Sequence, residues 1–158
     1  MMHKGKQIAA WAACALWMAL IFAMSAATGE ESGEHSGMIM QLLSLLLPQG
    51  VTADAALMMH LETLVRKVAH MSEYAVLFCL YRCALRLSGV RRAGLVAFAL
   101  SVGYAATDEI HQAFVPDRGP SPIDVMIDGG GALLGWAAAC LGEKLIRSYR
   151  QKSVQDRE

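Results

Sequence analysis

Ionisable side chains that can do acid–base or metal chemistry recur inside otherwise apolar stretches of this chain. They are Lys67, His70, Glu73, Asp108, Glu109, His111, Arg118, Asp124 and Asp128. An ionisable group inside a membrane or at its edge is costly, so a cluster of them marks a candidate functional site. We therefore expect the function of the chain to depend on these residues.

The spacing of the polar residues places them on single helix faces. Steps of three or four residues separate the members of three sets, which are Lys67, His70 and Tyr74, then Asp108 and His111, then Asp124 and Asp128. Residues three or four apart lie on one side of a helix. Three helices are therefore expected to point polar side chains toward a common site.

One chemistry that these side chains suit is the binding of a divalent metal. Imidazole and carboxylate groups bind zinc or manganese, and carboxylates alone suit magnesium. The candidate metal ligands are His70, Glu73, Asp108, His111, Asp124 and Asp128. Asp108 and His111 are spaced as two ligands on one helix face, which differs from the His-Glu-x-x-His pattern of metalloproteases.

A second chemistry is general acid–base catalysis on a bound substrate. Histidine changes its charge nearest to neutral pH, and carboxylates can accept or donate a proton. The candidate catalytic residues are His70, Glu73, Asp108, Glu109 and His111. Because a guanidinium group suits a phosphate or a carboxylate, Arg118 is a natural substrate contact. The candidate substrate-binding residues are Lys67, Tyr74, Gln112 and Arg118.

An ion-pair network that fixes the helix register explains the same residues without any reaction. The acids would then neutralise Lys67 and Arg118, and Asp124 and Asp128 would also stabilise the start of a helix through its dipole. Gathering five acids, two bases and two histidines for packing alone is costly. Both explanations stay open at this point.

The composition indicates a membrane protein. The 158 residues are 55% hydrophobic and 18% charged, a smaller share of charge than soluble domains carry. The net charge is zero, which gives no indication of a nucleic-acid partner. The cysteines, Cys14, Cys79, Cys83 and Cys140, lie in apolar stretches, which indicates buried small side chains rather than a disulfide framework.

Residues 1–158 are predicted to form one all-α membrane domain with four transmembrane helices, at about 7–27, 68–87, 91–112 and 122–146. The uncharged run at 8–27 is longer than the core of a typical secretory signal. The other uncharged runs are shorter, because 14 helical residues cover about 21 Å of a hydrocarbon core about 30 Å thick. Their polar ends are therefore expected to be submerged and to face protein.

Basic residues divide unequally between the two sides of this arrangement. Eleven of the 14 lysines and arginines lie on the side of both termini and of the turn after the second helix, and the others are Arg66, Lys67 and Arg118. The positive-inside rule then predicts cytoplasmic termini and a polar cluster at the outer face. In the external loop, 28–66, the apolar run 37–47 is too short to span and is expected to form an interfacial or re-entrant helix.

Two further patterns concern how the helices begin and pack. Thr52 or Asp54 can cap a helix that continues directly into the second span. The pair Gly131-x-x-x-Gly135 lets a neighbouring helix backbone approach closely. We prefer this packing interpretation to a phosphate cradle, because a cradle needs a preceding strand.

Three segments, RKVAHMSEY at 66–74, TDEIHQAFVPDR at 107–118 and DVMIDGGG at 124–131, resemble the VanZ-like family of small bacterial membrane proteins. The resemblance extends over nearly the whole chain. Asp117 departs from it, because the family usually has glycine at that place. The resemblance implies a multi-pass protein of the bacterial plasma membrane. The founding member of the family is associated with resistance to the glycopeptide teicoplanin.

Two functions fit these expectations. The first is a membrane enzyme, such as a metal-assisted hydrolase or transferase, that modifies a lipid-linked or cell-envelope substrate at the outer face. The second is a non-enzymatic envelope-binding protein that recognises a glycopeptide antibiotic or a precursor headgroup. In both cases membrane lipids surround the helices. An ion path is disfavoured, because the inner halves of the helices offer only Tyr81 and Ser101 as polar side chains.

We predict that the chain stays with the membrane fraction after an alkaline carbonate wash and is released by detergent, because its apolar helices require lipid. Ultracentrifugation followed by immunoblotting measures this partition, with a tagged soluble protein as the control. Recovery in the soluble fraction would instead indicate a soluble helical bundle.

Overall fold

A computed structural model of the protein describes residues 2–26, 37, 39–47, 54–116, 119 and 121–155. The helices are α1 (Met2–Ser25), α4 (Ala55–Leu87), α5 (Ala93–Gln112) and α6 (Pro122–Gln155). No strand occurs among these residues, so the predicted all-α fold class is confirmed. The helices occupy the expected positions, except that α4 begins well before residue 68 and α6 continues past residue 146.

Three of the described helices are long and apolar enough to cross a membrane. The candidate spans are Lys4–Ser25, Ala93–Gln112 and Pro122–Ser153. Large apolar side chains on them, such as Leu16, Leu95 and Leu133, are more than half exposed. Apolar surface exposed over this extent fits contact with lipid.

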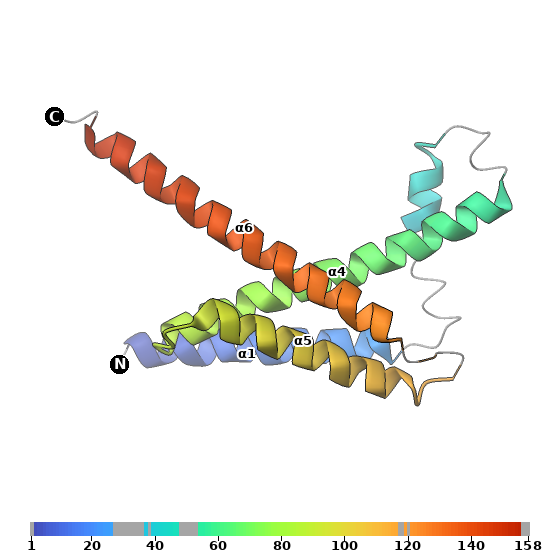
Figure 1. Ribbon diagram of the computed structural model, residues 1–158, viewed down its shortest axis with the longest axis horizontal. Coiled ribbons are helices and arrows are strands. Elements are labelled where there is room, and N and C mark those ends of the chain that lie inside the picture. Colours follow the sequence, from blue (N-terminus) through green and yellow to red (C-terminus); the bar gives the residue numbers. More distant parts are fainter. Residues whose placement is uncertain are drawn as a thin grey trace.

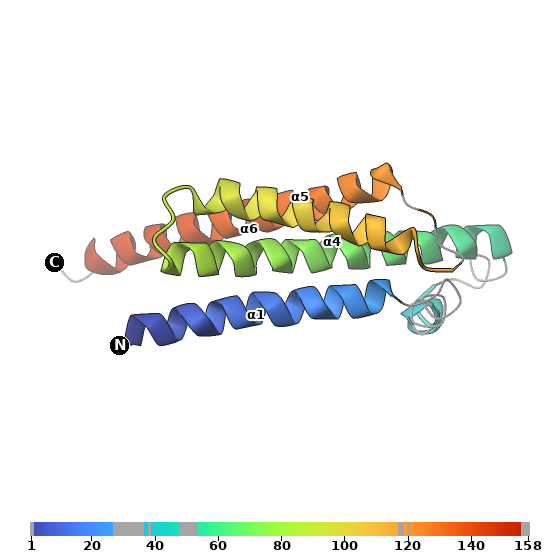
Figure 2. The ribbon, with the colours of Figure 1, turned by 90° about the horizontal axis from the view of Figure 1, so that it is seen from below.

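The helix α4 is not among these three candidate spans, although a span was expected at 68–87. Ionisable residues such as Lys67, Glu73 and Arg82 interrupt its apolar stretches. Yet α4 is the central helix, with α1 along one side and α5 and α6 on the other (Figure 2). Its neighbours therefore cover part of the α4 surface, and a fourth span at this helix stays a prediction.

The N-terminus of α4 is set by a side-chain cap. The Oδ1 atom of Asp54 accepts hydrogen bonds from the backbone N–H groups of Ala56 (3.0 Å) and Leu57 (3.1 Å). This pattern satisfies two of the N–H groups that lack a partner in the first turn of a helix. Asp54 is therefore the N-cap, and the helix runs without a break into the region of the second predicted span.

The C-terminus of α4 ends in a tight turn that leads back into α5. Gly89 has a φ of 78°, in the left-handed region that glycine adopts readily. Its N–H donates to the carbonyl of Arg86, and the N–H of Val90 donates to that of Leu85. This is a Schellman motif. It sends α5 back along α4, so α4 and α5 are antiparallel neighbours (Figure 2).

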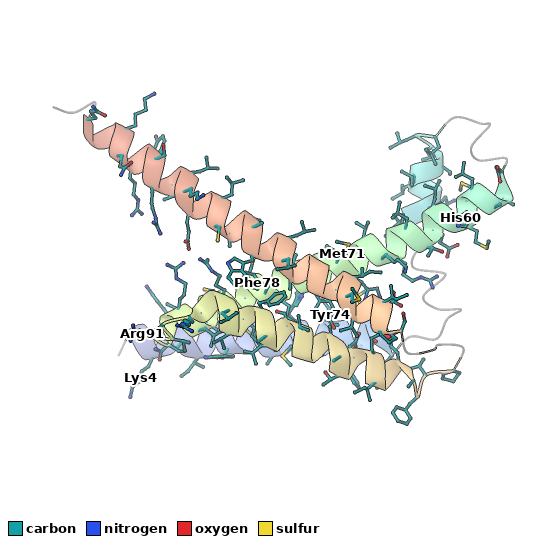
Figure 3. All side chains as sticks on the ribbon, viewed as in Figure 1. Lys4, His60, Met71, Tyr74, Phe78 and Arg91 are labelled. Atoms are coloured by element: carbon teal, nitrogen blue, oxygen red, sulfur yellow. The ribbon has the colours of Figure 1, made fainter. Side chains whose placement is uncertain are left out.

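The core lies where α4 faces its neighbours. Tyr74, Leu77 and Phe78 of α4 are fully buried, and Tyr74 and Phe78 point into the bundle (Figure 3). The ring of Phe78 stacks on Trp136 of α6, with centroids 5.7 Å apart and planes inclined by 19°. Aromatic burial of this kind contributes strongly to packing.

The expectation of buried cysteines is correct for Cys14 and wrong for two others. Cys79 and Cys83 are exposed on α4, and Cys140 is partly buried. All four thiols are free. This agrees with the expectation that the cysteines do not form a disulfide framework.

A short helical segment covers residues 39–44, inside the region where an interfacial or re-entrant helix was expected. Leu42 in this segment is exposed, as are Leu45 and Leu46 directly after it. Residues 28–36 of the same loop lie outside the described part of the chain. The placement of this segment relative to a membrane stays a prediction.

Glycines allow α4 and α6 to cross at very short range (Figure 1). A Cβ atom on Gly131 would overlap the backbone carbonyl of Met71, and one on Gly135 would lie 2.6 Å from the carbonyl oxygen of Ala75. Met71 lies at the crossing itself (Figure 3). The Gly131-x-x-x-Gly135 pair is therefore a helix-packing motif, as its spacing predicted.

We predict that Gly131→Ala destabilises the bundle by about 2 to 4 kcal/mol, because the backbones of α4 and α6 must separate to admit the methyl group. Gly130→Ala is the matched control, since the nearest atom to its added Cβ is the end of the Met71 side chain at 3.9 Å. That variant is expected to change stability by less than about 1 kcal/mol. Reversible unfolding in mixed micelles measures both. Equal effects of the two substitutions would contradict the packing assignment.

Candidate functional site

A pocket of about 290 Å³ opens between α4, α5 and α6 at the end of the bundle where α6 begins. We call it the polar pocket. Its wall is formed by Thr63, Arg66, Lys67, His70, Glu109, Gln112, Gly119, Asp124, Ile127 and Asp128. Cationic groups therefore face carboxylates across one cavity, with three helices contributing to it.

Hydrogen bonds and an ion pair hold the start of α6 against the other two helices. The Nζ atom of Lys67 lies 3.3 Å from Oδ1 of Asp124, and both side chains are about two-fifths exposed. The Oε2 atom of Glu109 accepts a hydrogen bond from the backbone N–H of Ser121 (2.9 Å). The N–H of Asp124 in turn donates to the Oγ atom of Ser121 (3.3 Å). These contacts fix the rim of the polar pocket.

Carboxylates continue from the pocket into the core. Asp108 and Asp128 are each only 2% exposed. The carboxylate of Asp128 is close enough to those of Asp108, Glu109, Asp124 and Glu73 to interact electrostatically with all four. Carboxylates from all three helices therefore lie near one another, which is the arrangement that the sequence led us to expect.

The described residues offer no hydrogen-bond partner to some polar atoms of this inner layer. They are Oδ1 of Asp108, Oδ1 of Asp128 and the hydroxyl of Tyr74. Leaving a buried polar atom unpaired costs about 1 to 3 kcal/mol.

The amide of Gln112 links this layer to α1. Its Nε2 atom donates to Oδ2 of Asp108 (3.2 Å) and to Oγ of Ser25 (2.9 Å), and all three side chains are buried. A second link joins α1 to α4, because Nε1 of Trp17 donates to the carbonyl oxygen of Glu73 (3.0 Å). Helix α1 is thus attached at the depth of the acidic layer.

The two predicted histidines have different surroundings. His70 lines the polar pocket, and its Nδ1 atom lies 3.9 Å from Oε2 of Glu73. The ring of His111 lies against Phe22 of α1, with centroids 4.1 Å apart. His111 is still close enough to Asp108 to interact with it electrostatically. It therefore adjoins the acidic layer from the α1 side rather than lining the pocket.

The sequence-predicted residues thus fall into groups according to their place. Those in the pocket wall are Lys67, His70, Glu109, Gln112, Asp124 and Asp128. Glu73, Tyr74 and Asp108 lie behind the wall, and His111 lies at the contact with α1. Arg118 lies outside the described residues.

Sequence reasoning missed Arg66 as a site residue. Its side chain lines the polar pocket and pairs with Glu62 at 3.5 Å. The signal was present, because Arg66 precedes His70 by four residues and so shares its helix face. Thr63 also lines the pocket and was also missed. It lies one turn before Lys67, on the helix face of that residue, so the same signal was present.

Metal binding was one of the chemistries expected of these residues. Within the described part of the chain, no three histidine, cysteine or carboxylate side chains are grouped as a set of metal ligands. The acids instead contact a lysine, a helix start and an amide. The divalent-metal site stays a prediction, while the arrangement at hand suits recognition of a charged headgroup and proton transfer.

Apolar helices around a polar pocket indicate a helical membrane protein with this pocket at one end of its bundle. The family model described as VanZ/LLP1 matches residues 10–143, so the chain belongs to the VanZ/LLP1 family. No curated protein and no solved structure matches the chain.

We predict that Gln112→Leu destabilises the protein by about 1 to 3 kcal/mol, because it removes a donor from two buried groups, Asp108 and Ser25. Thr107→Val is the control, as a substitution of similar size at an exposed site on α5, and it is expected to change stability by less than about 0.5 kcal/mol. Thermal unfolding in detergent measures both. A Gln112 variant as stable as the control would show that the link to α1 contributes nothing.

Proposed function

We propose that the polar pocket binds the headgroup of a lipid-linked or cell-envelope substrate at the outer face of the plasma membrane. The observation that carries this proposal is the wall itself, in which Arg66, Lys67 and His70 face Glu109, Asp124 and Asp128. Guanidinium and ammonium groups suit a phosphate or carboxylate. The facing carboxylates suit hydroxyl or amine groups of an attached sugar or peptide.

The proposal includes a topology with four spans and cytoplasmic termini. Lys4 and Arg91 lie at the end of the bundle opposite the polar pocket (Figure 3). Arg82, Arg86 and Arg92 lie toward the same turn. The positive-inside rule places this end in the cytoplasm, and the pocket then faces outward. Helix α4 serves as the fourth span, covered on both sides by its neighbours.

The reaction proposed for the pocket is acid–base hydrolysis or transfer at the bound headgroup. Histidine changes charge near neutral pH, so His70 is the proposed proton acceptor or donor on the wall. Glu73 lies beside it and can orient the imidazole ring. Asp128 and Asp108 supply buried carboxyl groups whose Oδ1 atoms have no hydrogen-bond partner among the described residues.

A non-enzymatic receptor is the second candidate function, with a glycopeptide such as teicoplanin or a precursor headgroup as its ligand. It is favoured by the contacts that already engage the wall. Lys67 pairs with Asp124, and Glu109 accepts from Ser121. Groups held in this way present a fixed surface for recognition without taking part in proton transfer.

We predict that Arg66→Gln weakens binding of a polyprenyl phosphate to the protein in nanodiscs by at least about tenfold, because a charge-assisted hydrogen bond to the phosphate is lost. Arg91→Gln, at the opposite end of the bundle, is the control and is expected to bind as the parent does. Microscale thermophoresis with labelled protein measures both affinities, and teicoplanin serves as the second ligand. Equal affinities of the two variants would contradict the proposed pocket.

The same experiment separates the enzyme from the receptor when His70→Gln is added. If the pocket is catalytic, this variant retains binding, but its turnover of the polyprenyl phosphate falls at least about a hundredfold. Turnover is measured as the rate of phosphate release. If the pocket is a receptor, neither parent nor variant releases phosphate, and the phenotype follows affinity.

A further inference from the structure

A groove runs between α4 and α6 on the side of their crossing that faces the α4–α5 turn. The two helices diverge there (Figure 1). One hollow, of about 360 Å³, is lined by apolar side chains that include Val76, Leu80, Leu134 and Ala138. A second hollow, of about 320 Å³, is lined by Arg82 and Arg86 among others. Cys79 borders both, so the two hollows adjoin along α4.

Among the described residues, the arginine end of this groove carries an excess of positive charge. Nη2 of Arg82 lies 2.7 Å from Oε1 of Glu143, and Arg86 also pairs with that oxygen. Nη2 of Arg147 lies 3.8 Å from the other oxygen, Oε2. Three guanidinium groups therefore share one carboxylate. The Arg82 side chain is only 17% exposed, so its charge is held in place rather than solvated freely.

We propose that this groove binds an anionic phospholipid. One acyl chain lies along the apolar hollow beside Leu134 and Ala138, and the headgroup phosphate contacts Arg82 and Arg86. Along α4 the lining is apolar first and becomes cationic toward the α4–α5 turn. A phospholipid that enters the bilayer from the side of this turn has the same order, with its acyl chains inward and its headgroup at the surface. The uncompensated charge selects an anionic headgroup over a zwitterionic one.

This site is independent of the polar pocket. The two lie on opposite sides of the α4–α6 crossing, and none of the described residues lines both. Loss of lipid binding in the groove therefore leaves headgroup binding in the pocket unchanged, and the converse also holds. A neutral lipid in the groove, or a second copy of the chain, are the competing occupants that the experiment must separate.

The test measures binding of phosphatidylglycerol and of phosphatidylcholine with the same acyl chains to the full-length protein, by native mass spectrometry in a neutral detergent. The parent protein is expected to prefer phosphatidylglycerol by at least about fivefold. Arg82→Gln/Arg86→Gln should lower the phosphatidylglycerol affinity at least about tenfold. Arg91→Gln/Arg92→Gln removes the same charge at exposed positions of the turn. It should change the phosphatidylglycerol affinity less than about threefold.

Two further variants keep the proposal falsifiable if the double arginine variant unfolds. Glu143→Gln leaves both arginines in place and releases them from their carboxylate, so phosphatidylglycerol should bind at least as tightly as to the parent. Ala138→Trp fills the apolar hollow and should lower binding at least about fivefold. Ala137→Trp, one residue away and outside the lining, should not.

Specific outcomes would overturn the proposal. They are equal affinity of the parent for the two lipids, equal losses in the two double arginine variants, and weaker binding by Glu143→Gln. A dimer that persists without lipid and dissociates with Ala138→Trp would assign the groove to a second copy instead.

Discussion

The close contact between the backbones of α4 and α6 is the constraint on which both hollows of the molecule depend. Lipid tails are as apolar as the helices, so no hydrophobic force presses transmembrane helices together, and close packing must hold them. Gly131 and Gly135 permit this packing against Met71 and Ala75. On one side of the crossing, α6 carries its acids over α4 to form the polar pocket. On the other side the helices diverge and leave the groove.

The central position of α4 is what allows us to propose a helix so rich in charge as the fourth span of the bundle. A charged side chain is costly where lipid surrounds it, but the cost falls when neighbouring helices cover it and supply partners. Lys67 pairs with Asp124 of α6, and Arg82 pairs with Glu143 of the same helix. Each pair joins α4 to α6 at one side of their crossing. The ionisable residues thus support the same contact that the glycines make possible.

Much of the fold could be predicted from the sequence, because it depends on local signals. The uncharged run in α1, the cap at Asp54 and the glycine pair each act over a few residues. Helical spacing also placed His70, Asp124 and Asp128 together correctly. The position of His111 against Phe22 could not be predicted in this way, because it depends on how α1 rotates against α5. Spacing gives the face of a helix, while the partner of that face is set by tertiary packing.

The buried acids give the polar pocket a property that its wall alone does not have. Asp108 and Asp128 are each only 2% exposed, and each has an oxygen atom to which the described residues offer no hydrogen-bond partner. An ion-pair network built only to fix helix register would be expected to satisfy such atoms, because an unpaired buried oxygen weakens the fold it belongs to. Asp128 in the pocket wall and Asp108 behind it are therefore the residues at which the two explanations of the cluster, a functional pocket and an ion-pair network, differ most.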